Sequence, residues 1–329
     1  MNVNNTVKER LTVSSSFAKV IITSIFAGKQ NVMKFFYLFL AALISIGITA
    51  QNSPVIIPFS LEDHSIYIYC KVNKTDNIKF LLDTGANGSV INMQAKKKPD
   101  LIIDGKSVNQ GSNGTNSVEH SSHNTVQLGD MEKKDVLFTL IPYETDHFDG
   151  VFGTDLMKGK IIEIDYHKKE IQFHDENSTT IDFTGYEKMK LHMVNDYPAV
   201  ESSFTVNGKE YSGLFGLDSG ADDALTIASP FARKNALANI MKTIGKATAQ
   251  GSDGSVYEMP VVLCPSLKFA QKFLYNIPVT LSSSKEGIDA TEKMAGFFGN
   301  KFLKKFNTII DFKRQLIYFK INKHLYESF

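Results

Sequence analysis

Residues 81–86 read LLDTGA, and this stretch decides the fold because it returns at residues 216–221 as GLDSGA. In each copy an aspartate, Asp83 or Asp218, leaves an apolar run and enters a glycine turn. A single Asp-x-Gly turn is common in a chain of ordinary composition. Two such turns at equivalent places of a repeated unit indicate a shared role for the two carboxylates.

Three further segments return in the same order, which indicates an internal duplication. GSNG at 111–114 returns as GSDG at 251–254, DGVFGTDL at 149–156 as AGFFGNKFL at 295–303, and IIEID at 161–165 as TIID at 308–311. Asp218 lies 135 positions after Asp83, while Gly299 lies 146 positions after Gly153. The similar offsets predict two copies of one unit, joined by the polar stretch 175–184.

The rest of the chain consists of short apolar runs separated by Gly, Asn and Asp. Runs such as SIYIY at 65–69 and VLFTLI at 136–141 follow the period of a β-strand. Helical patches should be brief, and one candidate is 229–242, where Pro230 stands near the N-terminus. We therefore predict an all-β protein with an N-terminal lobe at 51–180 and a C-terminal lobe at 181–329.

Composition excludes several classes of function. Lys and Arg number 36 against 35 Asp and Glu, so the net charge of +1 gives no basic surface for nucleic acid. His120 and His123 have no carboxylate or cysteine in the sequence to complete a metal site. We expect no metal, no cofactor and no nucleic-acid partner, and we expect Cys70 and Cys264 to be buried free thiols.

The N-terminal region predicts export. Residues 33–50 have a positive start, a short apolar centre and a small-residue exit before Gln51, as in a signal peptide. This pattern predicts a secreted or periplasmic protein. An uncleaved anchor is the alternative, and only then would a membrane be a partner. Residues 1–32 precede the signal peptide as an extension of doubtful relevance, and Met33 is an alternative start.

The paired aspartates suggest acid–base chemistry. Two like carboxylates brought together from related lobes cannot both be ionised, so they share one proton. The ionised member can activate a water molecule, and the protonated member can polarise a substrate carbonyl. Thr84 and Ser219 could hydrogen-bond across to the opposite lobe, while Gly85 and Gly220 present backbone N–H groups to the carboxylates.

These motifs resemble those of the aspartic peptidases, the superfamily that holds pepsin and the retroviral peptidases, and residues 149–157 resemble its bacterial retropepsin-like members. The resemblance implies a two-lobed aspartic-protease (double-psi barrel) fold with its active site formed within one chain. It implies Asp83 and Asp218 as catalytic residues, with Thr84, Gly85, Ala86, Ser219, Gly220 and Ala221 in support, and psi-loops at Val151, Phe152, Gly153, Phe297, Phe298 and Gly299.

The resemblance also implies a flap over the site. Its candidate residues are Gly111, Ser112, Asn113 and Gly114. Pepsins carry Ser or Thr where this chain has Ala86 and Ala221, so one hydrogen bond to the charged carboxylate is missing at each place. This difference predicts a less acidic dyad and an optimum in mild acid.

The expected function is that of an aspartic endopeptidase that hydrolyses extended polypeptides with water activated by Asp83 and Asp218. A non-catalytic peptide-binding protein that keeps the fold is the alternative, because Asp222 and Asp223 are extra acids beside Asp218. We interpret those two as a solvated turn. A third possibility is limited cleavage of one partner or of the chain itself.

Overall fold

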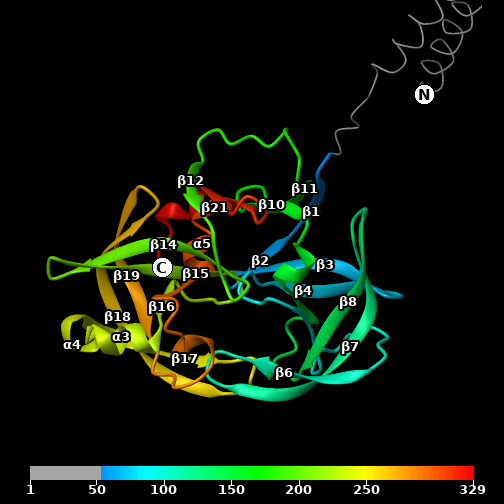
Figure 1. The fold of residues 1–329 in the computed structure, drawn as a ribbon, viewed down its shortest axis with the longest axis horizontal. Helices are drawn as coiled ribbons and strands as arrows, with labels where there is room; N and C mark the ends of the chain where they lie inside the picture. Colours follow the sequence, from blue (N-terminus) through cyan, green and yellow to red (C-terminus); the bar gives the residue numbers. More distant parts are fainter. Residues whose placement is uncertain (1–52) are drawn as a thin grey trace, which may run out of the picture. The chain divides into compact units, whose positions relative to one another are not determined.

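The computed structural model describes residues 53–329, and three β-sheets organise this part of the chain (Figure 1). The extension predicted at 1–32 and the signal peptide predicted at 33–50 lie outside the described residues. In Figure 1 the strands of the first half, coloured blue to green, lie on the right, and the yellow and orange strands of the second half lie on the left.

In the first eight-stranded sheet, the strand that comes last in the chain, β9, lies near the centre of the sheet. β9 lies between β4 and β5, parallel to β4 and antiparallel to β5. The order across the sheet is β2 (Ser60–Glu62), β3 (Ser65–Val72), β4 (Thr75–Leu82), β9 (Gly150–Phe152), β5 (Ser89–Asn92), β8 (Met131–Ile141), β7 (Thr115–Leu128) and β6 (Gly105–Gln110).

The second eight-stranded sheet repeats this order strand for strand. β20 enters it between β15 and β16, again parallel to one neighbour and antiparallel to the other. The order is β13 (His192–Val194), β14 (Tyr197–Val206), β15 (Lys209–Asp218), β20 (Gly296–Gly299), β16 (Leu225–Ile227), β19 (Lys272–Leu281), β18 (Val256–Phe269) and β17 (Lys242–Gln250). The predicted all-β, two-lobed fold with an internal duplication is confirmed.

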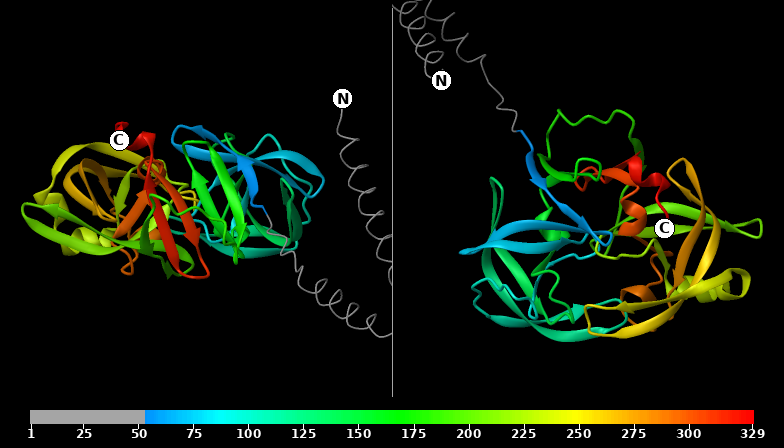
Figure 2. Two further views of the ribbon diagram at one scale, coloured as in Figure 1. Left: turned by 90° about the horizontal axis from the view of Figure 1, so that it is seen from above. Right: turned by 180° about the vertical axis from the view of Figure 1, so that it is seen from behind.

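A six-stranded sheet joins the two halves. Its central strands β10 and β21 pair with Ile162 opposite Ile310, and Figure 2 shows the green and red strands side by side between the lobes. The order is β1 (Val55–Pro58), β11 (Glu170–Asp175), β10 (Lys160–Asp165), β21 (Phe306–Asp311), β22 (Leu316–Ile321) and β12 (Glu187–Lys190). Because this sheet unites both halves in one unit, the lobe boundary at 180 and 181 stays a prediction.

Aromatic side chains fill the core where the second lobe meets the six-stranded sheet. Phe269 lies at their centre, with ring centroids 4.7 to 5.1 Å from those of Phe298, Phe302, Phe306 and Phe319. All five rings are almost completely buried. Each such ring contributes about 2–3 kcal/mol through its removal from water. This packing holds β20 and the loops at its end in a fixed position.

Among residues 53–329 the helices are few and short. They are α3 (Ser229–Lys234), α4 (Leu237–Ile240), α5 (Asn300–Leu303) and the 3₁₀ turns η2 (Thr154–Leu156), η3 (Ile288–Ala290) and η4 (Lys323–Tyr326). The helical patch expected at 229–242 is present as two short helices, α3 and α4, because Ala236 has a φ of 50° and Asn235 caps the carbonyl of Phe231. Within residues 53–329, no helix has the length and apolar character needed to cross a membrane.

Cys70 and Cys264 are buried and unpaired, as predicted. Burial raises the pKa of both thiols, that of Cys264 to about 11. They are therefore protonated at physiological pH and act as small apolar core residues.

Candidate active site

The two aspartates stand at equivalent strand ends. Asp83 follows the last residue of β4, and Asp218 is the last residue of β15. The strand inserted beside each one supports it: the carbonyl of Phe152 accepts a hydrogen bond from Asp83 N at 3.1 Å, and Gly299 pairs with Asp218. The predicted psi-loop residues thus lie directly beside both turns, on β9 and β20 and at Gly153, the residue after β9.

The glycine at the end of each inserted strand, Gly153 just after β9 and Gly299 as the last residue of β20, is required by close contact with the turns. A Cβ on Gly153 would lie 2.5 Å from the carbonyl oxygen of Gly88, and one on Gly299 would lie 2.4 Å from that of Asp223. Beyond them, the backbone N–H groups of the next residues bind the alanines of the motifs. Thr154 N donates to Ala86 O at 2.8 Å, and Asn300 N donates to Ala221 O at 2.7 Å.

Each carboxylate is held by its own turn in the same way. Asp83 Oδ1 accepts from the N–H groups of Gly85 and Ala86 at 2.7 and 3.1 Å. Asp218 Oδ1 accepts from the corresponding pair at 3.0 and 3.1 Å, and these two donors are Gly220 N and Ala221 N. The equal geometry leaves the second oxygen of each carboxylate free for other partners.

Each carboxylate also lies against the glycine of the opposite turn. A Cβ on Gly220 would be 2.5 Å from Cγ of Asp83, and one on Gly85 would be 2.7 Å from Cγ of Asp218. The two turns therefore bring both carboxylates into one site. Burial and the negative charge of Asp218 raise the pKa of the Asp83 carboxyl well above its ordinary value.

The residue after each aspartate binds the opposite turn. Ser219 Oγ accepts from Thr84 N at 3.0 Å and donates to Leu82 O at 2.8 Å. Thr84 Oγ1 accepts from Ser219 N at 3.0 Å and donates to Leu217 O at 2.6 Å. Both side chains are buried, at 3% and 1% exposure, so all four bonds are shielded from water.

One residue that contacts the dyad was missed by the sequence analysis. The hydroxyl group of Tyr197, at the start of β14, donates to Asp218 Oδ2 at 2.8 Å. The available signal was a difference between the repeats, since Gly216 stands two residues before Asp218 where the first copy has Leu81. That glycine leaves room for the tyrosine ring.

The candidate flap residues form the turn of a long hairpin. Gly111, Ser112, Asn113 and Gly114 connect β6 to β7, and Gly111 N donates to Gly114 O at 3.0 Å. Figure 1 shows β6 meeting β17 on the side of β4 and β15 that is opposite the six-stranded sheet. The hairpins of both lobes therefore close over the same side of the two aspartates.

The two hairpin tips are bonded to each other. Asn109 Nδ2 donates to the carbonyl and hydroxyl oxygens of Ser252 at 3.1 and 3.2 Å, and Asn113 N donates to Asp253 Oδ2 at 3.1 Å. We call these contacts between 109–113 and 252–253 the tip latch. They join one lobe to the other at the duplicated GSNG and GSDG segments.

The loop that contains η3 also binds the tip of the first-lobe hairpin. Ile288 N donates to Gly111 O at 3.0 Å and Asp289 N donates to Ser112 O at 3.1 Å. The buried carboxylate of Asp289 accepts from the hydroxyl of Tyr257 at 3.1 Å. Burial and the charge of Asp218 raise the pKa of Asp289 to about 6. The first-lobe tip is therefore docked beside a carboxyl that is protonated in mild acid.

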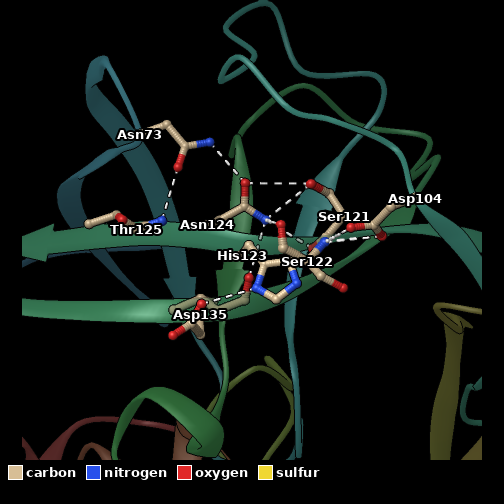
Figure 3. Close-up of polar contacts among 9 residues, drawn as sticks. Asn73, Asp104, Ser121, Ser122, His123, Asn124, Thr125 and Asp135 are labelled. Carbon is tan, nitrogen blue, oxygen red and sulfur yellow. Dashed lines mark hydrogen bonds and ion pairs between the residues drawn. The ribbon is translucent and has the colours of Figure 1, made fainter.

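A bulge bends the first hairpin at its base. The pairing of β7 with β8 shifts at Ser121 and Asn124, and His123 between them has a φ of 60°. Figure 3 shows Asn124 between Asn73 and Ser121: it accepts from Asn73 Nδ2 at 2.8 Å and donates to Ser121 O at 2.9 Å. These bonds anchor the base and leave the tip to its contacts with the second lobe.

The two histidines considered as metal ligands serve other contacts. His120 Nδ1 bonds Ser107 Oγ at 2.6 Å, and the exposed ring of His123 meets Asp135 at 3.0 Å (Figure 3). Across the described part of the chain, no three His, Cys, Asp or Glu side chains gather in a group that could hold a metal ion.

The two acids after the second motif differ from each other. Asp222 is exposed, in agreement with a solvated turn. Asp223 is not solvated in this way, because its carboxylate accepts from the hydroxyl of Thr226 and lies against Gly299. Burial raises the pKa of Asp223 to about 7, and the charge of Asp218 acts in the same direction.

Comparison with known proteins agrees with this architecture. Residues 68–156 match the family model of aspartyl proteases. The aspartic proteinase from Irpex lacteus superposes with a TM-score of 0.54 at 11% identity, covering 84% of this chain and 99% of its own. Basic 7S globulin from soybean gives 0.50 at 10% identity, covering 84% and 97%. No curated protein sequence matches the chain. The structural likenesses establish the fold.

Proposed function

We propose that this chain, which has the two-lobed aspartic-protease fold, is an aspartic endopeptidase that hydrolyses extended polypeptides with water activated by Asp83 and Asp218. The observation that carries the proposal is the mutual placement of the two turns. Each carboxylate lies against the glycine of the opposite turn, and the buried Thr84 and Ser219 bind across. A scaffold that used the fold only to bind peptides would have no chemical need for this pairing.

The reaction needs one ionised and one protonated carboxyl. In the first step the ionised carboxylate takes a proton from water while the water oxygen bonds to the peptide carbon. At the same time the protonated carboxyl gives its proton to the carbonyl oxygen, which yields a neutral gem-diol. In the second step the carboxyl that took the proton from water protonates the leaving nitrogen as the C–N bond breaks. The other carboxyl, now ionised, takes the proton of one diol hydroxyl, so the dyad ends in its starting state.

The raised pKa of Asp83 supports this use of the pair. A carboxyl that stays protonated in mild acid, beside a second one that accepts several hydrogen bonds, provides an acid and a base at the same pH. We expect the optimum in mild acid. As the pH rises above mild acid, Asp83 loses the proton that it must give to the carbonyl oxygen, so activity should fall.

The tip latch supports a closing role for both hairpins. Expelling water from the site strengthens every hydrogen bond to the reacting groups. Because the tips are bonded to each other, an extended polypeptide would reach the dyad after the hairpins separate. The active site is formed within one chain, so the proposal requires no second copy.

A non-catalytic peptide-binding protein is the second candidate. Two observations favour it: Asp223 and the buried Asp289 place further carboxyls near Asp218, and one structural neighbour is named a globulin. A peptide held under the closed hairpins would need no chemistry.

The proposed compartment is the secreted or periplasmic space. It is supported by the signal-peptide pattern at residues 33–50. Sequencing the N-terminus of the exported protein tests this proposal, and a mature chain that begins at Gln51 is the expected result. A chain that keeps its apolar segment would support the membrane-anchored alternative.

Cleavage of a diverse peptide library by the full chain across pH 3 to 7 tests the enzymatic function. We expect cleavage that a statine-type inhibitor blocks and that falls by at least 1,000-fold in both Asp83→Asn and Asp218→Asn, since each removes one member of the acid–base pair. Cleavage that survives in either variant would reject the dyad. A folded wild-type chain that binds peptides and cleaves none would favour the second candidate.

A further inference from the structure

Because of Tyr197, the two carboxylates of the dyad accept different numbers of hydrogen bonds. Its hydroxyl donates to Asp218 Oδ2, which gives Asp218 three donors together with the two N–H groups of its own turn. Among the described residues, Asp83 receives two N–H donors and otherwise shares a proton with Asp218. The additional donor binds Oδ2 of Asp218, the oxygen that does not accept from the N–H groups of the turn.

The tyrosine is held firmly in this position. The residue is 6% exposed, and its ring packs on Phe297 with ring centroids 5.4 Å apart. A Cβ on Gly216 would lie 2.6 Å from Cε1 of the ring, and a Cβ on Gly85 would lie 2.6 Å from the hydroxyl oxygen. Two glycines therefore make the space that the side chain needs to reach the carboxylate.

The first lobe has no equivalent. Gly216 pairs with Ala199 in β14 and β15, whereas the corresponding pair in β3 and β4 is Leu81 with Tyr67. Two residues before Tyr67 the chain has Ser65, the counterpart of Tyr197 two residues before Ala199. The shorter side chain and the larger Leu81 exclude the same contact with Asp83.

We propose that Tyr197 keeps Asp218 as the ionised member of the dyad, so that Asp83 carries the shared proton. This inference rests on the proposed function and assigns its two roles: Asp218 takes the proton from water, and Asp83 gives its proton to the carbonyl oxygen. Tyr197 retains its own proton throughout and acts through Asp218 as a positioning residue. A hydroxyl that donates to a carboxylate favours the charged form of that carboxylate.

The titratable groups around Asp218 show what the hydroxyl of Tyr197 has to offset. Burial and the charge of Asp218 raise the pKa of Tyr197 well above its ordinary value, so its hydroxyl remains a donor over the working range. The other titratable groups that act on Asp218 or on its partner are Asp83, Asp223, Asp289 and Tyr143, and none of these carries positive charge. The tyrosine is thus the side-chain donor that offsets the acidic surroundings of Asp218.

Tyr197→Phe tests the proposal because it removes one oxygen and keeps the packed ring. We expect the acid limb of the profile of kcat/KM against pH to move up by about one unit, since this limb reports the ionisation of the base. We also expect kcat to fall about tenfold while KM changes less than twofold. Tyr211→Phe is the matched control, because Tyr211 is a buried tyrosine that packs on Phe204 in the same lobe.

A second readout is independent of activity. Infrared titration of the carboxyl bands in the full chain compares Asp83→Asn, where Asp218 remains, with Asp218→Asn, where Asp83 remains. We expect Asp218 to ionise at the lower pH, and adding Tyr197→Phe to raise the pH at which Asp218 ionises but not that of Asp83. The reverse order of ionisation would overturn the assignment, as would an acid limb that Tyr197→Phe leaves in place.

The two proposals can fail separately. If the wild-type chain cleaves nothing, the peptidase function fails, while the infrared order of ionisation still decides the inference. If wild-type cleavage is normal and Tyr197→Phe lowers the rate equally at every pH, the tyrosine only supports the structure and the inference is rejected.

Discussion

Thr84 and Ser219 each accept the backbone N–H of the other at 3.0 Å, so the two turns are tied by a reciprocal pair of buried hydrogen bonds. Each hydroxyl also donates to a carbonyl of the opposite turn, Leu217 for Thr84 and Leu82 for Ser219. Removing either hydroxyl leaves one N–H and one C=O without partners inside the protein. The four hydrogen bonds therefore stabilise the contact between the two lobes as one network.

Thr84→Val and Ser219→Ala are each expected to lower the free energy of unfolding by about 2–4 kcal/mol, because two buried polar groups lose their partners. The double variant should lose less than the sum, since both changes break one network. Urea unfolding measures the three values. Ser212→Ala, an exposed position on β15, is the control and should change stability by less than about 0.5 kcal/mol. Additive losses would mean that the two hydroxyls do not act as one unit.

Gly220→Ala should abolish activity while the fold is kept. Its Cβ would stand 2.5 Å from Cγ of Asp83, so the carboxylate must move from its place beside Asp218. We expect cleavage to fall by at least 100-fold, because catalytic groups act only in narrow geometry. Gly88→Ala is a matched control in the first turn, where a Cβ meets nothing within 4 Å. Equal activity in the two variants would contradict the close approach of the turns.

The sequence predicts the features that are set by residues close together in the chain and misses those that depend on contacts between distant segments. Period-two alternation and the Asp-x-Gly turns are local, so the repeat was sufficient to predict the two related sheets and to single out Asp83 and Asp218. The contact of Tyr197 is not local. It depends on the pairing of β14 with β15 and on the absence of side chains at Gly216 and Gly85, which the pattern of apolar residues does not reveal.

The tip latch was beyond prediction for the same reason. Gly111 to Gly114 could be recognised as a turn, but their partners come from two loops of the other lobe, at 252–253 and 288–289. The helical patch expected at 229–242 is divided into α3 and α4 by the backbone angle at Ala236. In each case the missing information is a contact that forms only when distant segments are brought together.

The protein should be more stable in mild acid than above neutral pH. Burial raises the pKa of Asp223 to about 7, against about 4 in an unfolded chain. The folded state therefore binds more protons, and the free energy of unfolding falls as the pH rises from about 4 through 7. Asp289 and Asp83 are shifted in the same direction. Asp223→Asn should reduce the fall between pH 4 and 8 by on the order of 2 kcal/mol.

Urea unfolding at several pH values checks this slope, with Asp222→Asn as the control at the exposed neighbour. Glu327 does not mask the effect. Its pKa is lowered to about 2 by hydrogen bonds from Lys304 and His324, so its contribution is lost only as the pH falls below about 4.5. A slope that Asp223→Asn leaves unchanged would show that Asp223 is ionised without penalty in the folded state.

Locking the tip latch should block the site reversibly. Asn113 N lies 3.1 Å from a carboxylate oxygen of Asp253, so residues 113 and 253 are neighbours across the tips, and Asn113→Cys combined with Asp253→Cys offers two thiols there for a disulfide. We expect the oxidised double variant to cleave peptides, or to bind a statine-type inhibitor, at least tenfold more slowly than the reduced form. The reason is that an extended ligand reaches the dyad only when the tips separate.

Cys70 and Cys264 are buried and should not interfere. The two single variants are the controls and should not respond to the reductant. If mass analysis proves the cross-link and the oxidised protein still works at the full rate, peptides enter without separation of the tips and the closing role of the hairpins is wrong.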